Sequence, residues 1–318
     1  REYKIDAPGA TPTTIVSSPD GRIAYVVMSY KHVVGIDLLT GDKVFEHDLS
    51  HKPDERVINM GLTISADGSE LFSYELPTRM GIDHYEVQPA RLSVYSTSAE
   101  DFGDPVRIFT DVPRRIQLMM TGTDGAYIYA LGFDLYKMDA QTGEIVDTYP
   151  VMNWERENLS QPDLLNFWPM SEQSGMFSTL LFSVRTDLSP DDMAAYPTDG
   201  LALDLATGEV ELTKLDVPPQ VLFTATISPD RKHLYAVYTT VLKFDREDGA
   251  LLAQGEVDHS YYQVNVSGDG TEIYLGGTFC DIAIRDAETL EQTGAVSLPG
   301  CPSMGAAAMR MIQLDLGE

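Results

Sequence analysis

Short runs of hydrophobic residues alternate with turn residues along the whole chain. Residues 23–27 read IAYVV, 33–36 read VVGI and 273–277 read IYLGG. Runs of β-branched and aromatic residues bounded by Gly, Asp and Ser are typical of antiparallel β-strands. No long stretch has the period of an α-helix, and short helical turns are the most that 154–165 and 191–196 allow. The pattern predicts an all-β protein.

A two-part turn pattern recurs between these runs. A Ser-x-Asp-Gly-like turn begins near residues 18, 65, 123, 228 and 267. An Asp-x-x-Thr-Gly-like turn begins near residues 37, 139, 204, 245 and 286, with a degenerate copy at 96–98. Units of about 40 to 50 residues cannot bury their own hydrophobic faces, and this spacing indicates the blades of a β-propeller. A parallel sheet is excluded because the crossover helices that it needs are missing from the pattern.

The repeats divide most of the chain into six candidate blades. They occupy 12–50, 57–110, 114–150, 160–216, 220–257 and 260–300. The fragments 1–6 and 303–316 are left over, and neither is long enough to form a blade alone. Because a ring closes well when both ends share a blade, we expect a seven-bladed β-propeller whose closing blade is shared between the N- and C-termini. Six blades is the alternative, since 1–6 supplies one strand at most. We expect 1–318 to form a single β-propeller domain.

The chain is strongly acidic. Its 318 residues include 49 Asp and Glu against 22 Lys and Arg, so the formal net charge is 22 − 49 = −27. Such a field repels phosphate backbones, and nucleic acid is therefore not expected as a partner. The acidity either serves solubility, which is the simpler reading, or attracts a basic partner. No apolar run of about 18 residues occurs, so no membrane span is expected.

The two cysteines, Cys280 and Cys301, leave two readings open. They could pair in an oxidising compartment, or both could be small core residues, and the unpaired reading is favoured. Neither belongs to a C-x-x-C-H motif, so attachment of a c-type haem to this chain is not expected.

Three irregular insertions interrupt the repeats at 75–91, 153–178 and 186–198. Insertions in a propeller project from its faces, where loops carry function on a rigid scaffold. Both tryptophans of the chain, Trp154 and Trp168, lie in the second insertion, where they would form an interface or cap the propeller.

Recognisable catalytic machinery is missing from the sequence. No G-x-S-x-G, H-E-x-x-H or Walker motif occurs, and the Asp-Gly turns lack the twelve-residue calcium pattern. His84 and His259 have no second histidine at ligand spacing, which favours structural hydrogen bonds over metal binding. The aromatics around Tyr261 could wall a pocket, although packing between blades is favoured. We expect no catalytic residue and no metal site in this chain, which points to a scaffold or subunit.

Several longer strings carry a resemblance. They are HYEVQPARL at 84–92, QPDLL at 161–165, HSYYQVNVS at 259–267, YLGG at 274–277, DAETLE at 286–291 and LPG at 298–300. In these strings, and through nearly its whole length, the chain resembles the β subunit of quinohemoprotein amine dehydrogenase. One departure lies near the start, where the first three residues, REY, run almost at once into a Pro-containing turn and the family has a longer segment.

The resemblance implies a seven-bladed propeller without a cofactor, in a periplasmic αβγ heterotrimer. In that family a γ subunit carries cysteine tryptophylquinone and an α subunit carries two c-type haems. Primary amines are oxidised to aldehydes and ammonia, and electron transfer proceeds to a cupredoxin or cytochrome c. The β subunit shields the quinone subunit and helps to form the substrate cavity.

From these motifs we predict five cavity or interface residues. They are Tyr85, Trp168, His259, Tyr261 and Tyr262. Two other functions stay open on the sequence alone: a non-catalytic propeller scaffold of a different assembly, and a propeller hydrolase that uses a metal ion held by residues from several blades.

Overall fold

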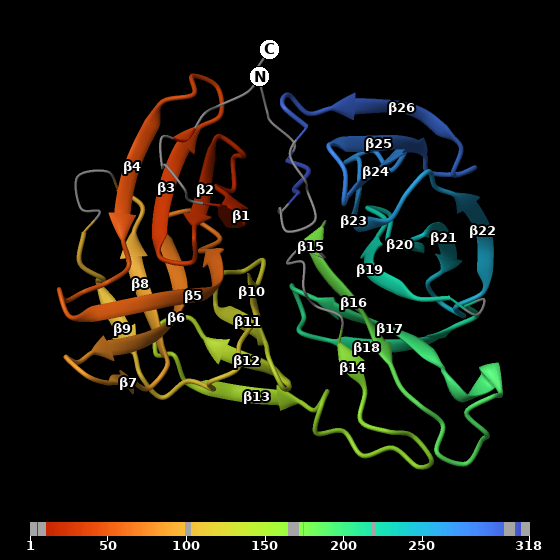
Figure 1. Ribbon diagram of the computed structural model, residues 1–318, viewed down its shortest axis with the longest axis horizontal. Coiled ribbons are helices and arrows are strands. Elements are labelled where there is room, and N and C mark those ends of the chain that lie inside the picture. The colour runs from red at the N-terminus through yellow and green to blue at the C-terminus, as the bar shows by residue number, and fades with distance from the viewer. Residues whose placement is uncertain are drawn as a thin grey trace. The chain divides into compact units, whose positions relative to one another are not determined.

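Six antiparallel β-sheets make up the computed structural model, which describes residues 5, 11–98, 103–164, 172–173, 175–217, 220–301 and 309–312. Contacts divide the chain into two compact units, residues 1–148 with 312–318 and residues 149–311. Three sheets belong to each unit, apart from the last residue of β13. No α-helix occurs in the described part of the chain (Figure 1). The chain is an all-β, six-bladed β-propeller.

The first unit holds blades 1 to 3. Blade 1 consists of β1 (Pro12–Ser17), β2 (Ile23–Met28), β3 (His32–Asp37) and β4 (Lys43–Asp48). Blade 2 consists of β5 (Glu55–Ile64), β6 (Glu70–Met80), β7 (Tyr85–Val87), β8 (Arg91–Ser96) and β9 (Arg107–Phe109). Blade 3 consists of β10 (Leu118–Thr121), β11 (Tyr127–Leu131), β12 (Leu135–Asp139) and β13 (Ile145–Tyr149).

The second unit holds blades 4 to 6. Blade 4 consists of β14 (Asp163–Leu164), β15 (Glu172–Gln173), β16 (Met176–Phe182), β17 (Thr198–Asp204) and β18 (Val210–Leu215), with a 3₁₀ turn at Met193–Ala195. Blade 5 consists of β19 (Leu222–Ile227), β20 (His233–Tyr238), β21 (Thr240–Asp245) and β22 (Leu251–Glu256). Blade 6 consists of β23 (Tyr261–Val266), β24 (Glu272–Gly277), β25 (Asp281–Asp286) and β26 (Gln292–Ser297).

The expectation of seven blades is wrong. Each of the six predicted stretches corresponds to one sheet, although β5 begins two residues before the second stretch, so the six blade positions are confirmed. Every sheet is completed by strands that follow one another in the chain, and so none needs a strand from the other terminus. Of the two leftover fragments, the described residues 5 and 309–312 lie in no strand, and the rest lies outside the described residues. No blade shared between the termini is present in the described part of the chain.

The repeated turns owe their form to a few side-chain hydrogen bonds. In the first turn type, the Ser65 hydroxyl donates to Asp67 Oδ1 at 2.6 Å and accepts from the Glu70 N–H. The same bonds recur around Ser18, Ser228 and Ser267. In the second type, the side chain of Asp37 accepts from the N–H groups of the second and third residues after it. These local bonds explain why the turns could be located from sequence.

Glycines in the second turn type let neighbouring blades approach each other. Gly249 has φ +76°, and a Cβ at this position would lie 2.0 Å from the carbonyl oxygen of Lys214 in β18 of the adjacent blade. A Cβ at Gly143 would likewise lie 2.4 Å from the ring of Phe109 in β9. Only glycine fits where a positive φ and a close neighbour coincide.

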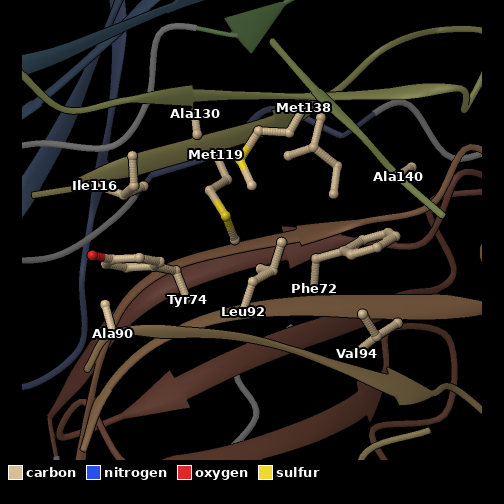
Figure 2. Close-up of a cluster of buried hydrophobic side chains, with 11 residues drawn as sticks. Phe72, Tyr74, Ala90, Leu92, Val94, Ile116, Met119, Ala130, Met138 and Ala140 are labelled. Carbon is tan, nitrogen blue, oxygen red and sulfur yellow. The ribbon is translucent and has the colours of Figure 1, made fainter. Parts of the chain in front are cut away.

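Hydrophobic side chains fill the space between consecutive blades within each unit. Figure 2 shows one such cluster, where Phe72, Tyr74 and Leu92 of blade 2 face Met119 and Ile116 at blade 3. The Tyr74 hydroxyl donates to the carbonyl oxygen of Pro113. Each fully buried aliphatic or aromatic side chain contributes about 1.5–3 kcal/mol. Packing between blades therefore supplies the stability that one repeat lacks.

Candidate functional site

A pocket of about 740 Å³ lies in the second unit. Its walls come from the second and third insertions, from the end of β16 and the two residues after it, and from the residues just before β19. They include Gln161, Phe182, Val184, Met193, Tyr196 and Val221. Met193, Tyr196 and Val221 are each about half exposed, at 56%, 47% and 52%. The pocket is therefore open to solvent and mostly apolar at its rim.

Local hydrogen bonds fix the wall that the third insertion contributes. The carboxylate of Asp192 caps the 3₁₀ turn by accepting from the Ala194 N–H at 2.9 Å. The Tyr196 hydroxyl donates to the carbonyl oxygen of Pro190, also at 2.9 Å. Ala195 is fully buried and anchors the turn. A loop held in this way presents Met193 and Tyr196 in one arrangement before any ligand binds.

Arg156 holds the second insertion against blade 4. Its guanidinium donates to Asp199 at 2.8 Å and to Ser183 at 2.5 Å, and it lies 4.2 Å from the ring centre of Trp154. Trp154 also makes an edge contact with Tyr149. Trp154 is thus part of the packing of this insertion. Trp168, which we predicted at a cavity or interface, lies outside the described residues.

His259 and Tyr261 meet at the carboxylate of Asp281. His259 Nε2 lies 2.9 Å from Asp281 Oδ1, and the Tyr261 hydroxyl donates to Oδ2 at 2.8 Å. The His259 ring lies 4.2 Å from that of Tyr261 and 4.6 Å from that of Phe279. Burial, and next the hydrogen bond to Asp281, raise the pKa of Tyr261. Tyr261 is 1% exposed, so a ligand could touch His259 or Phe279 but not this phenol.

Cys280 and Cys301 form a disulfide. The favoured unpaired reading is therefore wrong, because the β24–β25 hairpin brings Cys280 beside the segment that follows β26. The N–H of Leu298 donates to the carbonyl oxygen of Cys280 at 2.7 Å. The bond closes a separation of 21 residues and fastens the hairpin that carries Phe279 and Asp281.

Tyr262 belongs to a different cluster from its neighbour Tyr261, because successive side chains of a strand point to opposite faces. Its ring stacks on Tyr238 at 5.9 Å and makes an edge contact with Phe223 at 5.2 Å. Phe223 follows closely after the pocket residues Gln220 and Val221. The three half-buried rings thus form an aromatic cluster that joins blades 5 and 6 next to the pocket segment.

Tyr85 lies in the first unit, on the short strand β7, and is 71% exposed. The neighbouring His84 is also exposed and contacts Asp83 at 2.8 Å. The structure therefore brings two of the predicted residues together, His259 and Tyr261. Tyr262 packs in a different cluster of the second unit, and Tyr85 belongs to the first unit.

A buried charged network in blade 2 was not identified from sequence. The Glu75 side chain has no solvent exposure, and it accepts from Arg91 Nε at 2.6 Å, from Ser93 Oγ at 3.0 Å and from the Tyr95 hydroxyl at 2.9 Å. Arg91 also forms a two-fold ion pair with Glu55. Burial raises the pKa of Glu75, and the neighbouring Arg91 opposes that shift. The signal in the sequence was Glu75, an acidic residue within a mostly apolar strand, which the sheet places opposite Arg91.

The described residues contain no group of three or more His, Cys, Asp or Glu side chains placed to hold a metal ion. They also contain no helix of the length and apolar character that crossing a membrane demands. Comparison with known families finds no family model that matches the chain, and no curated protein matches it in sequence.

Proposed function

We propose that this β-propeller is the cofactor-free subunit of a periplasmic amine dehydrogenase that oxidises primary amines. In the proposed complex, a γ subunit carries cysteine tryptophylquinone and an α subunit carries two c-type haems. These groups would supply the oxidation of the amine to an aldehyde and ammonia and the transfer of electrons to a cupredoxin or cytochrome c. The proposal relies on the sequence strings and on the pocket, not on blade count, because the resemblance implies seven blades and the chain has six.

The observation that carries the proposal is the apolar pocket of the second unit. It includes Gln161 and Asp163 of the string QPDLL, one of the strings that carry the resemblance. Exposed apolar side chains gathered in one concave place are typical of a surface that a partner covers. In the proposed complex, Met193, Tyr196 and Val221 would contact the quinone subunit and exclude water from its substrate cavity. Water exclusion strengthens the electrostatic interactions of a reacting group.

The disulfide also supports the proposal. Cys280 and Cys301 are the two cysteines of the chain, and each sulfur is bonded to the other. Neither sulfur is therefore available for a thioether to a haem or to a quinone side chain, which fits with redox groups on partner subunits. Disulfides also persist in oxidising compartments such as the periplasm.

Co-purification from the native source tests the proposal. We expect the chain to elute with a dihaem subunit and a small quinone-bearing subunit, and the complex to reduce an electron acceptor when a primary amine is added. Visible absorption that belongs to this polypeptide alone would contradict the cofactor-free role. Partners without haem or quinone would instead identify a scaffold of another assembly.

A pair of variants tests the role of the pocket. Val221→Asp places a charge at the rim, where a covering partner would have to desolvate it, and we expect the complex to dissociate on gel filtration. Val146→Asp is the matched control, since Val146 is 50% exposed on β13 of the first unit. Equal retention of the partners by both variants would show that the pocket is not the contact surface.

A further inference from the structure

The strands β5, β6 and β7 form a three-stranded arm in the first unit, made of residues 55–58 and 76–87 (Figure 1). The hairpin β5–β6 continues past the part of β6 that pairs with β8, and β7 takes the place beside this continuation. Within the described residues, no strand is paired with the outer edge of β7.

One face of the arm is apolar and exposed. Cross-strand partners lie on the same face of a sheet, and so do alternate residues of a strand. The pairs Met80 with Tyr85 and Thr78 with Val87 therefore place these four side chains together, and Ile58 joins them through Leu76 on the same face. Ile58, Met80, Tyr85 and Val87 are 38%, 37%, 71% and 61% exposed.

The opposite face of the arm has a different character. Arg79 pairs there with Asp54 at 3.1 Å, and Val57 is buried in the blade 1–blade 2 core. This face therefore holds an ion pair and one core residue. The other face carries Ile58, Met80, Tyr85 and Val87, which within the described residues meet solvent, and beside them Leu76, which packs against the blade 2–blade 3 core.

The outer edge of β7 also has unused backbone groups. The N–H of Gln88 donates to the Pro77 carbonyl, and the N–H of Gly81 donates to the His84 carbonyl. These bonds make Arg79 and Glu86 the hydrogen-bonded pair between them, because such pairs alternate along an antiparallel ladder. The backbone N–H and C=O of Tyr85 and Val87 consequently point away from β6, toward the open edge.

We propose that this edge binds an extended segment of a different polypeptide, which adds as a strand beside β7 and covers the apolar face. Main-chain bonds at Tyr85 and Val87 would supply affinity, and the exposed side chains would select alternating apolar residues. Natural edge strands that avoid pairing often carry lysine or proline. β7 carries neither, and its one charged side chain, Glu86, lies on the face opposite Tyr85 and Val87. The proposal does not depend on the amine dehydrogenase function.

Charge indicates that the segment is acidic and is not a second copy of this chain. Arg56 lies on the apolar face and is exposed, and Arg114 donates to the Gln88 carbonyl oxygen at the end of β7. Among the described residues, neither arginine has a carboxylate partner. An acidic segment complements both. Two copies of the arm related by a two-fold axis would instead bring the same arginines together.

Photo-crosslinking in cells of the native source identifies the occupant. A benzoylphenylalanine at position 85 is expected to crosslink to one extended, acidic segment of another polypeptide, and the same probe at position 86, on the opposite face, is not. Crosslinks to a second copy of the chain, to a helical segment, or to nothing would overturn the proposal.

The mapped segment, made as a synthetic peptide, then tests the binding mode. Val87→Pro removes an outward N–H and keeps the bonds between β7 and β6, so we expect affinity to fall about tenfold. Glu86→Gln, the control, should bind within about twofold of the wild type. Tyr85→Glu places a negative charge on the apolar face, which repels an acidic segment and leaves the backbone hydrogen bonds unchanged. It replaces Val87→Pro in this test if that variant does not fold. Wild-type affinity in Val87→Pro and Tyr85→Glu would refute strand addition.

Discussion

Glu75 is a carboxylate that the fold has removed entirely from water. Three donors surround it, and Arg91 links it to Glu55 near the surface. Burying a charge costs more than its partners return unless every hydrogen bond is made. Glu75 therefore ties strands β6 and β8 together only as long as its charge and its three donors are all present.

Replacing Glu75 with glutamine should lower the free energy of unfolding by about 2 kcal/mol, because Arg91 keeps Glu55 but loses a buried charge partner. Urea unfolding measures the change. Glu70→Gln is a control, since Glu70 likewise pairs with an arginine, Arg107, through two hydrogen bonds, but on the partly exposed surface of the same blade. Its cost should stay below about 1 kcal/mol. Equal costs for both variants would contradict this account.

The turn carboxylates predict a pH dependence. The pKa of Asp67 is lowered to about 2, chiefly because the Ser65 hydroxyl, and then the N–H and hydroxyl of Ser69, donate to the carboxylate. A lowered pKa means that the charged form stabilises the fold at pH values above the ordinary value of 3.8, and that this stabilisation is lost as the pH falls toward 2.

The stability difference between wild type and Asp67→Asn should thus be largest at pH 7 and shrink between about pH 4 and pH 2. Unfolding curves at several pH values measure it, and Ser65→Ala should move the transition toward ordinary carboxylate behaviour. A difference that is the same at pH 7 and pH 2 would refute the assignment.

Residue by residue, the sequence revealed local chemistry and missed contacts made across the fold. The Ser and Asp turns were located because their partners lie within five residues. The pairing of Cys280 with Cys301 was not, since a separation of 21 residues says nothing about the distance between two Cα atoms. The Asp281 carboxylate that joins His259 to Tyr261 was missed for the same reason, because it comes from another strand.

At the scale of elements, two glycine-containing turns allow the cost of backbone strain to be distinguished from the cost of steric crowding between blades. Gly249 and Gly270 share φ +76°, but a Cβ would lie 2.0 Å from a backbone oxygen at Gly249 and no nearer than 3.7 Å to any atom at Gly270. Gly270→Ala should cost about 1 kcal/mol for the left-handed conformation. Gly249→Ala should cost about 3 kcal/mol or more, because Lys214 in β18 must also move. Thermal unfolding measures both, and equal costs would show that the contact between blades yields easily.

The difference between local signals and contacts between distant residues explains which elements could be predicted. Six strand groups followed from turns and alternation, which are local signals. The β5–β6–β7 arm was not predicted, because it lies mostly in the irregular insertion at 75–91, and the partners of its β6 residues in β5 are 18 to 24 residues away. The pocket was only hinted at by the insertions, since its rim joins residues from 160 to 221.

At the scale of the whole molecule, the net charge of −27 opposes folding through self-repulsion. Added salt screens such repulsion, and the Debye length falls from about 30 Å at 0.01 M to about 8 Å at 0.15 M. The melting temperature should therefore rise by about 2 °C or more over this range. Calorimetry at pH 7 measures the shift, with pH 4 as a control, where partial protonation of carboxylates should reduce it. No shift at pH 7 would indicate that the charges are already neutralised in pairs.

The number of blades is a property of the whole molecule that the repeats did not settle. Counting units gave six, and the seventh came from assigning the leftover ends to a shared blade. The described strands show that β1 and β26 already complete their own sheets. Whether a sheet is complete depends on which strands pair, and the residues left over at the chain termini do not show that.

Each described blade is formed by one continuous stretch of the polypeptide. A single in-frame duplication or deletion in the gene can therefore add or remove a whole blade and leave the other strand pairings as they were. A lineage of such proteins can change its repeat number in one genetic step, whereas a ring closed by a strand from the far terminus would have to preserve that distant partnership as well.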